Sequence, residues 1–344
     1  MIDINLIKNK KVLIMGGAGF IGHNLALKLK EYGAEPFIVD GLQVNNLGYY
    51  ISQSENSNSD LYISFINERI KILRKNKINV NIFDIREYNL VSQYISKVRP
   101  DFVIHLAAIS HANRSNKDPF STFDHSLRTL ENVLDTLKNF KTHLIYFSSS
   151  MVYGHFKNKF ATEEDHCNPL GIYGALKYGA EKLVIAYGQV FEVPYTIIRP
   201  SALYGERCVS RRVGQALIEN AISGKDLTIN GDGEEELDFT YIDDLIQGIV
   251  KCLISDKSRN EIFNITYGEG RKLNELAKII TDSFPGSKLV FRPRDNLMPI
   301  RGTLSIDKAR NKIGFEPNYS IEKGLIKYIN WYKEFSSKNS NLFK

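Results

Sequence analysis

The sequence predicts an α/β protein whose core is a doubly wound parallel β-sheet, joined to a smaller C-terminal α/β lobe. Three observations predict this class. Unbroken apolar runs alternate with amphipathic segments from residue 11 to about residue 200, and a glycine-rich turn directly follows the first run. After that the alternation loosens into shorter runs and turns such as "NGDGEEE". Apolar strands separated by helices are typical of a parallel sheet that is covered on both faces.

The predicted strands are apolar runs of about four to six residues. In chain order they are 11–15, 36–40, 80–83, 101–107, 143–148 and 195–200. Helical spacing follows the first strand over 21–32 and recurs over 123–139 and 173–189. Residues 41–79 form a long connection, whose segment "DLYISFINERIKILRKN" predicts an added surface helix.

These elements predict two structural units. The nucleotide-binding domain spans 1–200, and segments at about 236–265 return to it. The smaller lobe comprises 201–235 and 266–335, and we expect it to reach over the carboxyl edge of the sheet and to hold substrate.

Composition excludes several classes. The chain of 344 residues is 43% hydrophobic and 24% charged, which is ordinary for a globular protein. Its net charge of +6 forms no basic stripe interleaved with aromatics, so nucleic-acid binding is disfavoured and an anionic small substrate explains the excess equally well. The three cysteines show no CxxC spacing, which disfavours a disulfide framework or a zinc site. The polar N-terminus and the absence of an 18-residue apolar run predict a cytoplasmic protein with no membrane span.

The segment "VLIMGGAGFIG" predicts a phosphate-binding loop. Gly16, Gly17, Gly19 and Gly22 lie between the first strand and the first helix. Glycines there permit a tight turn, close approach of the backbone to a pyrophosphate, and close packing of helix on strand. The N–H groups of the helix terminus are then free to bind the anion. This context predicts a Rossmann-type dinucleotide site.

Two acidic residues at strand ends extend this site. Asp40 lies 18 residues beyond Gly22, where a carboxylate binds the adenosine ribose and repels a 2′-phosphate; we therefore expect NAD and not NADP. Asp84 closes the next strand and is placed to meet the adenine edge. An alternative role for Asp84 is to cap the helix that begins in "REYNLVSQYI".

The segment "GIYGALKYGAEKLV" supplies a candidate base. Tyr173 and Lys177 are four residues apart and share one helix face. A free tyrosine, with a pKa near 10, is a poor base at neutral pH. An ammonium group one turn away favours the phenolate, which can then take a hydroxyl proton while a hydride leaves the same carbon.

In this order, "GGAGFIG", "DFVIHLAA", "FSSSMVYG", "YGALK", "IIRPSALYG" and "GDGEEELDFTYIDDL" resemble the extended short-chain dehydrogenases/reductases. More narrowly, the chain is similar to the NAD-dependent nucleotide-sugar epimerase/dehydratase group from about Lys11 to Trp331. The resemblance implies that Ser149 hydrogen-bonds the sugar oxygen being oxidised. It also implies that Tyr173 is the general base, and that Lys177 tunes it and holds the nicotinamide ribose. Ser148 and Ser150 are expected to make packing and loop contacts.

The predicted site residues fall into sets that overlap at the catalytic groups. The catalytic set is Ser149, Tyr173 and Lys177. The cofactor-binding set is Gly16, Gly19, Phe20, Ile21, Gly22, Asp40, Asp84, Ile85, Leu106, Ala107, Ala108, Tyr173 and Lys177. The substrate-binding set is Ser149, Ser150, Met151, Arg207, Arg211, Arg212, Arg292 and Arg301. No metal is expected.

Met151 bears on the reaction. The 4,6-dehydratases of the group have an Asp-Glu pair after the catalytic threonine, where this chain has Ser150 and Met151. A thioether exchanges no protons, so dehydration becomes the alternative. Oxidation at C4 is favoured, as a C4 epimerase or a C4 dehydrogenase in surface polysaccharide biosynthesis.

The chain also departs from its relatives. Several have asparagine at the position of Ala202 and arginine at that of Leu237, and both residues hold the substrate nucleotide or diphosphate. The arginines of the substrate-binding set are candidates to replace them, because guanidinium groups suit diphosphates. Cys208 is interpreted as a neutral spacer. The substrate is expected to be a GDP-, UDP- or dTDP-linked sugar, and GDP-heptose is one alternative.

A second class of function is a non-catalytic NAD-sensing or RNA-binding protein on the same scaffold. The presence of Ser149, Tyr173 and Lys177 together disfavours it, because a binding module does not need all three. The resemblance also implies a homodimer, for which segments 120–139 and 170–190 would form a four-helix bundle.

Overall fold

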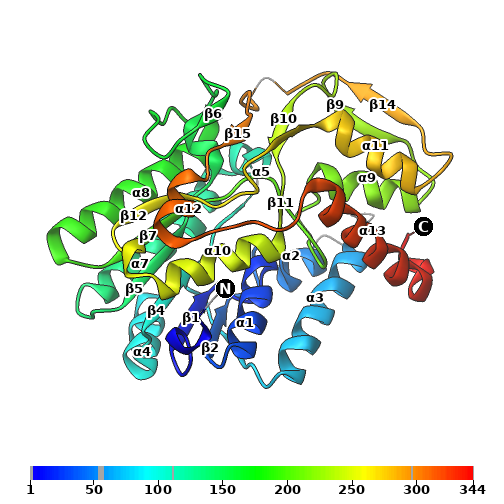
Figure 1. The fold of residues 1–344 in the computed structure, drawn as a ribbon. Coiled ribbons are helices and arrows are strands. Elements are labelled where there is room, and N and C mark those ends of the chain that lie inside the picture. Colours follow the sequence, from blue (N-terminus) through cyan, green and yellow to red (C-terminus); the bar gives the residue numbers. More distant parts are fainter. Residues whose placement is uncertain (1–2, 53–57, 111, 296, 344) are drawn as a thin grey trace.

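The computed structural model describes residues 3–52, 58–110, 112–295 and 297–343. Its centre is a seven-stranded sheet in the order β12-β7-β5-β4-β1-β2-β3, with every neighbouring pair parallel (Figure 1). The strands are β1 (Lys11–Met15), β2 (Glu35–Asp40), β3 (Val80–Ile82), β4 (Phe102–His105), β5 (His143–Phe147), β7 (Tyr195–Arg199) and β12 (Glu261–Asn264). The predicted fold class is confirmed.

Alternate side chains of these strands enter two separate cores. Val12 and Ile14 of β1 pack in one core, whereas Leu13 and Met15 pack in the other. The first core is covered by α1 (Phe20–Glu31), α3 (Ser59–Lys75) and α10 (Ile242–Ile254), and the second by α4 (Tyr88–Val98), α7 (Thr129–Leu137) and α8 (Gly171–Phe191). Burial on both faces explains why the strands are unbroken apolar runs.

The strand order reverses between β1 and β4, since the chain runs from β1 to β2 on one side and to β4 and β5 on the other. Ligands of doubly wound sheets bind at the carboxyl ends of the strands where the order reverses. The glycine-rich turn leaves β1 at this point, and β4 ends there at His105, two residues before the end predicted for it.

The inserted connection forms α2 (Leu47–Ser52) and α3. The predicted helix is present, but it is more than a surface addition, because one face of α3 is buried and Phe65 packs on Trp331 with ring centroids 5.0 Å apart. Nε of Arg69 donates to the carbonyl of Arg207 at 3.0 Å, and the Tyr50 hydroxyl donates to the carbonyl of Val209 at 2.7 Å. The insertion therefore holds the loop that follows β8 (Leu203–Tyr204).

The predicted helix over 123–139 is divided. Helix α6 (Pro119–Phe123) begins after Asp118, whose side chain accepts a hydrogen bond from the N–H of Ser121. A π-helical turn, Asp124–Arg128, then leads into α7. Such turns are rare insertions in helices and often occur at functional sites. Helix α5 (Ala112–Lys117) precedes this region and contacts α8.

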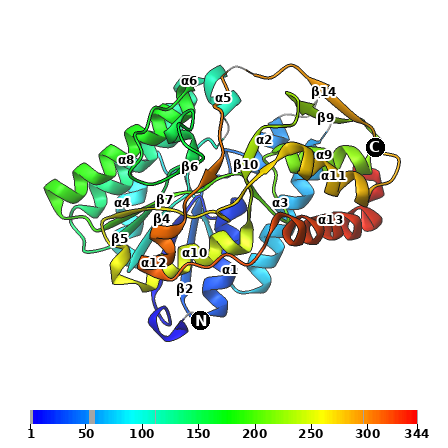
Figure 2. The ribbon, with the colours of Figure 1, turned by 45° about the horizontal axis from the view of Figure 1, so that its top comes forward.

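The smaller lobe lies beyond the carboxyl edge of the sheet and is built from short paired strands and helices (Figure 2). Its pairs are β9 (Leu227–Asn230) with β14 (Leu289–Arg292) and β10 (Glu236–Asp238) with β13 (Gly270–Lys272). Its helices are α9 (Val213–Ile222), α11 (Leu273–Ser283) and α13 (Ile321–Lys338). Further pairs are β11 (Thr240–Tyr241) with β8, and β15 (Thr303–Leu304) with β6 (Phe160–Ala161); α12 is Asp307–Ile313. Helix α10 and β12 return to the sheet, while the exact domain boundaries stay a prediction.

Within the described ranges, every helix is too short or too polar to cross a lipid bilayer.

Candidate active site

The glycine loop fits closely against its surroundings. Gly16 has φ +80°, and a Cβ there would lie 2.9 Å from the backbone nitrogen of Ala107. A Cβ on Gly22 would lie 2.5 Å from the Cα of Gly17. Gly19 is the N-cap of α1 and offers no side chain to the first turn of the helix. The free N–H groups of this turn are therefore available to an anion.

Asp40 ties the end of β2 to this loop. One carboxylate oxygen accepts the N–H of Ala18 at 3.0 Å, and the other accepts the N–H of Leu42 at 2.8 Å. Burial raises the pKa of the carboxyl group, and the two backbone hydrogen bonds oppose that rise. The side chain lines a cavity at the carboxyl edge of the sheet. An acidic group at this place suits a ribose with two free hydroxyls.

Asp84 has a strong partner of its own. Its Oδ2 lies 2.6 Å from Nη2 of Arg86, which also contacts Asp124 at 2.6 Å. Burial raises the pKa of Asp84, but the hydrogen bonds from Arg86 outweigh it and bring the pKa to about 2. Helix α4 takes Glu87 as its N-cap, so Asp84 is not the capping residue. Asp84 therefore lines the cavity as a group that is charged at neutral pH.

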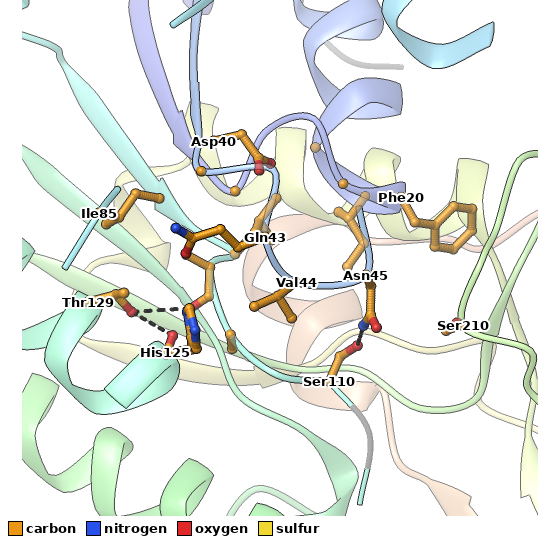
Figure 3. A pocket seen from close by; sticks show the side chains of 18 of the residues that line it. Phe20, Asp40, Gln43, Val44, Asn45, Ile85, Ser110, His125, Thr129 and Ser210 are labelled. Carbon is orange, nitrogen blue, oxygen red and sulfur yellow. Dashed lines mark hydrogen bonds between the residues drawn. The ribbon is translucent and has the colours of Figure 1, made fainter. Parts of the chain in front are cut away.

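The cavity brings together residues that are widely separated in the chain (Figure 3). It contains eleven of the predicted cofactor-binding residues, namely Gly16, Gly19, Phe20, Ile21, Gly22, Asp40, Asp84, Ile85, Leu106, Ala107 and Ala108. Ten further residues line the cavity that no sequence motif indicated, namely Gly41, Gln43, Val44, Asn45, Ser110, His125, Thr129, Leu203, Val209 and Ser210. Position after a strand end could have indicated Gly41 to Asn45, but no motif marks His125 or Thr129. Nδ2 of Asn45 donates to the Ser110 hydroxyl at 3.2 Å across this space.

The three consecutive serines have different partners. Ser148 donates to Oε1 of Glu181, and Ser150 donates to the hydroxyl of Ser201 at 3.3 Å. Ser149 accepts the N–H of Met151 at 3.2 Å, and its hydroxyl lies close enough to Tyr173 to lower the pKa of that phenol. Ser149 is thus the serine that meets the candidate base.

Tyr173 is 8% exposed, and burial raises the pKa of its phenol. The positive charge of Arg212 and the hydrogen bond with Ser149 both lower it. Lys177 also contacts the end of β5, because its Nζ donates to the carbonyl of Phe147 at 2.6 Å. Burial lowers the pKa of Lys177 to about 8, and Glu181 opposes that fall. Arg212 is thus one cation that favours the phenolate, and the tuning of Tyr173 by Lys177 stays a prediction.

The predicted arginines are not gathered in one place. Arg212 lines the cavity and donates from Nη2 to the carbonyl of Ser110 at 3.3 Å. Arg207 instead lies 3.3 Å from Glu68, and Arg211 lies 3.3 Å from Glu219. Arg292 is exposed at the end of β14. The structure brings only the first of these four to the cavity.

Three further residues considered from the sequence have largely buried side chains, namely Arg301, Met151 and Cys208. The side chain of Arg301 is 10% exposed and lies 3.6 Å from Glu235, while its Nε has no hydrogen-bond partner among the residues that the structure describes. Met151 is 6% exposed and offers no titratable group beside Ser149. Cys208 is 2% exposed, and its sulfur lies 3.0 Å from the hydroxyl of Ser210. In the described part of the chain, no three His, Cys, Asp or Glu residues form a group that could hold a metal ion.

These features define an NAD-binding oxidoreductase of the extended short-chain dehydrogenase/reductase type. Residues 12–266 match the NAD dependent epimerase/dehydratase family, and the chain belongs to that family. NAD is accordingly its cofactor, and the glycine loop, the helix terminus and Asp40 fit that molecule.

Individual relatives cover nearly the whole chain. Protein CapI of Staphylococcus aureus is 26% identical over 353 residues, covering 95% of this chain and 100% of its own. A dTDP-glucose 4,6-dehydratase of Haemophilus influenzae is 25% identical over 358 residues, covering 96% and 99%. The crystal structure of UDP-glucuronic acid 4-epimerase from Bacillus cereus, in complex with UDP-glucuronic acid and NAD, has a TM-score of 0.85 at 27% identity, covering 94% and 99%. The chain thus resembles both an epimerase and a dehydratase.

Replacing Arg212 by glutamine is expected to move the acid limb of the kcat/KM pH profile to higher pH. The charge of Arg212 lowers the pKa of Tyr173, so its loss lets burial raise that pKa further. The phenolate then forms only at higher pH. Arg212→Lys keeps the charge and should restore most of the limb. An acid limb that is the same in wild type and Arg212→Gln would show that the guanidinium does not act on the base.

Proposed function

We propose that the chain oxidises C4 of a nucleotide-activated sugar and returns the hydride to the opposite face, as an NAD-dependent C4 epimerase. The observation that carries the proposal is the arrangement around Ser149. A serine lies beside a buried tyrosine and lowers the pKa of its phenol, while the neighbouring Ser150 and Met151 supply no proton-transferring pair. C4 oxidation needs the first two groups, whereas elimination of water needs an acid and a base in addition.

The chain's own groups act on the proton. Ser149 hydrogen-bonds the C4 oxygen and orients it toward the phenol oxygen of Tyr173. Tyr173 takes the hydroxyl proton as the C4–O bond becomes a carbonyl, and gives the proton back when the carbonyl is reduced. NAD bound in the cavity supplies the hydride acceptor and donor. Rotation of the 4-keto sugar between the two transfers inverts the configuration at C4.

The electrostatics of the site suit this cycle. Arg212 stabilises the phenolate while the base is deprotonated. Lys177 retains a protonatable amine next to the end of β5, where we propose that it holds the nicotinamide ribose. The burial of Tyr173, at 8% exposed, keeps bulk water from exchanging the proton during the reaction.

The nucleotide and the sugar are a finer part of the proposal. Arg301, whose side chain is 10% exposed, lies close enough to Arg212 for the charge of Arg212 to lower its pKa. Guanidinium groups of this kind suit the diphosphate of a nucleotide sugar. We also propose a role in surface polysaccharide biosynthesis, which is supported by the similarity to CapI and to the epimerase and dehydratase relatives. GDP-heptose stays among the candidate substrates.

A homodimer is also proposed. Leu183, Val190 and Phe191 of α8 are 41%, 69% and 46% exposed, and Phe120 of α6 is 84% exposed. Exposed apolar side chains on α6 and α8 favour association with a second copy. Sedimentation analysis of the purified protein should give twice the mass of one chain, and a single-chain mass at micromolar concentration would contradict the dimer.

The function is tested with purified protein and a panel of GDP-, UDP- and dTDP-sugars, analysed by mass spectrometry and chromatography while NADH absorbance is followed. A product of unchanged mass and new retention time would establish the epimerase. Loss of two hydrogens with accumulation of NADH would make the enzyme a C4 dehydrogenase. Loss of water would contradict the interpretation of Met151. No conversion of any sugar by NAD-loaded protein would favour the non-catalytic alternative.

A further inference from the structure

Three successive turns of α8 contact three successive residues at the end of β5. Tyr173 lies beside Ser149, whose hydroxyl lowers the pKa of its phenol, Lys177 donates to the carbonyl of Phe147, and Glu181 accepts the hydroxyl of Ser148. These helix residues are spaced by four, so they lie on one face. Ser149 therefore follows two residues, Phe147 and Ser148, that contact α8. None of the residues in those two contacts is a predicted substrate-binding residue.

The carboxylate of Glu181 is fixed from the opposite side. Nε and Nη2 of Arg199 donate to its two oxygens at 2.9 and 2.7 Å. Both side chains are almost completely buried, at 1% and 3% exposed. Arg199 ends β7, the strand next to β5. A buried bidentate pair of this geometry allows little movement of either partner.

The network continues into the smaller lobe. Nη1 of Arg199 donates to the Tyr153 hydroxyl at 3.0 Å, and that hydroxyl donates to Oδ1 of Asn264 at 2.7 Å. Nδ2 of Asn264 donates to the carbonyls of Ala161 and Ser305 at 3.2 and 3.1 Å. The pair thus connects the end of β5 to the segment around β6 and β15.

We propose that Glu181, clamped by Arg199, is a positioning residue that sets the place of Ser149 and serves as the counter-charge of Lys177. It touches neither substrate nor cofactor and acts only through those two residues. The inference rests on the proposed roles of Ser149 and Lys177. It goes beyond them because a residue outside the catalytic set controls both.

The two effects are separable by substitution. Ser148→Ala removes the hydrogen bond between the end of β5 and Glu181, and it leaves every charge in place. Glu181→Gln keeps the shape of the side chain and removes the counter-charge. Since Glu181→Gln leaves Arg199 buried without an anion, the double variant Glu181→Gln/Arg199→Gln removes both charges together and protects folding.

The first readout is the pH dependence of NAD binding to cofactor-free protein, which requires no sugar. Lys177 meets Glu181 and Tyr173 on α8, the ring of Tyr146 on β5 at 5.1 Å, and His105 on β4, whose pKa burial lowers to about 3. Of these groups, only Glu181 favours the ammonium form of Lys177. NAD affinity of the wild type should fall by about tenfold as pH rises through the pKa of Lys177, because a charge-assisted hydrogen bond is lost.

Loss of Glu181 lowers the pKa of Lys177, so this fall should occur at lower pH in Glu181→Gln and in the double variant. Ser148→Ala should leave the midpoint unchanged. With a nucleotide sugar that the enzyme converts, Ser148→Ala should lower kcat by about tenfold and leave KM nearly unchanged, because Ser149 is then misplaced relative to the reacting atom.

Asp244→Asn is the matched control. Asp244 is a 1% exposed carboxylate on α10 that accepts the N–H groups of Asn318 and Tyr319, so its loss should lower stability without moving the NAD midpoint. An unchanged midpoint in both Glu181 variants would overturn the counter-charge role, and an unchanged kcat in Ser148→Ala would overturn the positioning role. Because the binding experiment uses no sugar, its outcome stays informative even if no sugar is converted.

Discussion

Tyr173→Phe is expected to lower kcat by about a thousandfold while NAD affinity stays within a few-fold of wild type, since a positioned acid–base group contributes on this scale. The ring keeps its place on α8, and only the hydroxyl that meets Ser149 is lost. Turnover is measured with an active nucleotide sugar, and NAD affinity by titration of cofactor-free protein.

Tyr178→Phe is the control on the same helix. Nζ of Lys182 lies 4.9 Å from the centroid of its ring, which packs against the cluster of Val152 and Tyr153, so its hydroxyl should be dispensable for turnover. A Tyr173→Phe enzyme with wild-type kcat would remove the tyrosine from the mechanism. An equal loss in both variants would point to a general effect on α8.

Gly22→Ala is expected to weaken NAD binding by tenfold to about a hundredfold. The new Cβ would lie 2.5 Å from the Cα of Gly17 and 2.6 Å from its carbonyl oxygen, both of which are backbone atoms. Relief requires α1 to move away from the loop, and overpacking of this kind costs about 1–3 kcal/mol, where 1.4 kcal/mol is tenfold in affinity. Calorimetric titration with NAD measures the change.

Gly179→Ala provides the comparison. This glycine is exposed in the middle of α8, and a Cβ there meets no atom within 4 Å. Alanine should raise stability by about 0.5–1 kcal/mol and leave NAD affinity unchanged. Wild-type NAD affinity in Gly22→Ala would show that the loop does not depend on the close approach of α1.

The sheet could be predicted well because burial on both faces leaves a strong signal in sequence. The β1 strand matches its predicted bounds, and β5 and β7 each end one residue earlier than predicted. The glycine loop was equally visible, because its spacing reflects steric limits between backbone atoms. Local patterns of this kind report local geometry.

The direction of individual side chains could not be predicted in the same way. Spacing placed Tyr173 and Lys177 on one helix face, but it did not reveal that a carbonyl at the end of β5 binds Lys177. Arg212 lies 39 positions from Tyr173 in the chain, so no periodicity connects them. The same limit applies to Arg207, whose carboxylate partner Glu68 comes from the insertion.

The insertion illustrates a further limit. Its helical spacing was clear, yet the burial of Arg69 depends on the carbonyls of Ala18 and Arg207, which belong to two distant loops. A buried guanidinium is indistinguishable in sequence from an exposed one. Contacts between segments far apart in the chain therefore had to come from the structure.

The most direct test of the central claim is to follow deuterium placed at C4 of a nucleotide sugar that the enzyme converts. Our account predicts that the deuterium is retained at C4 of the product with inverted configuration, and that none enters solvent. Deuterium lost to solvent would contradict hydride transfer, and deuterium left at C4 with unchanged configuration would contradict reaction at that carbon.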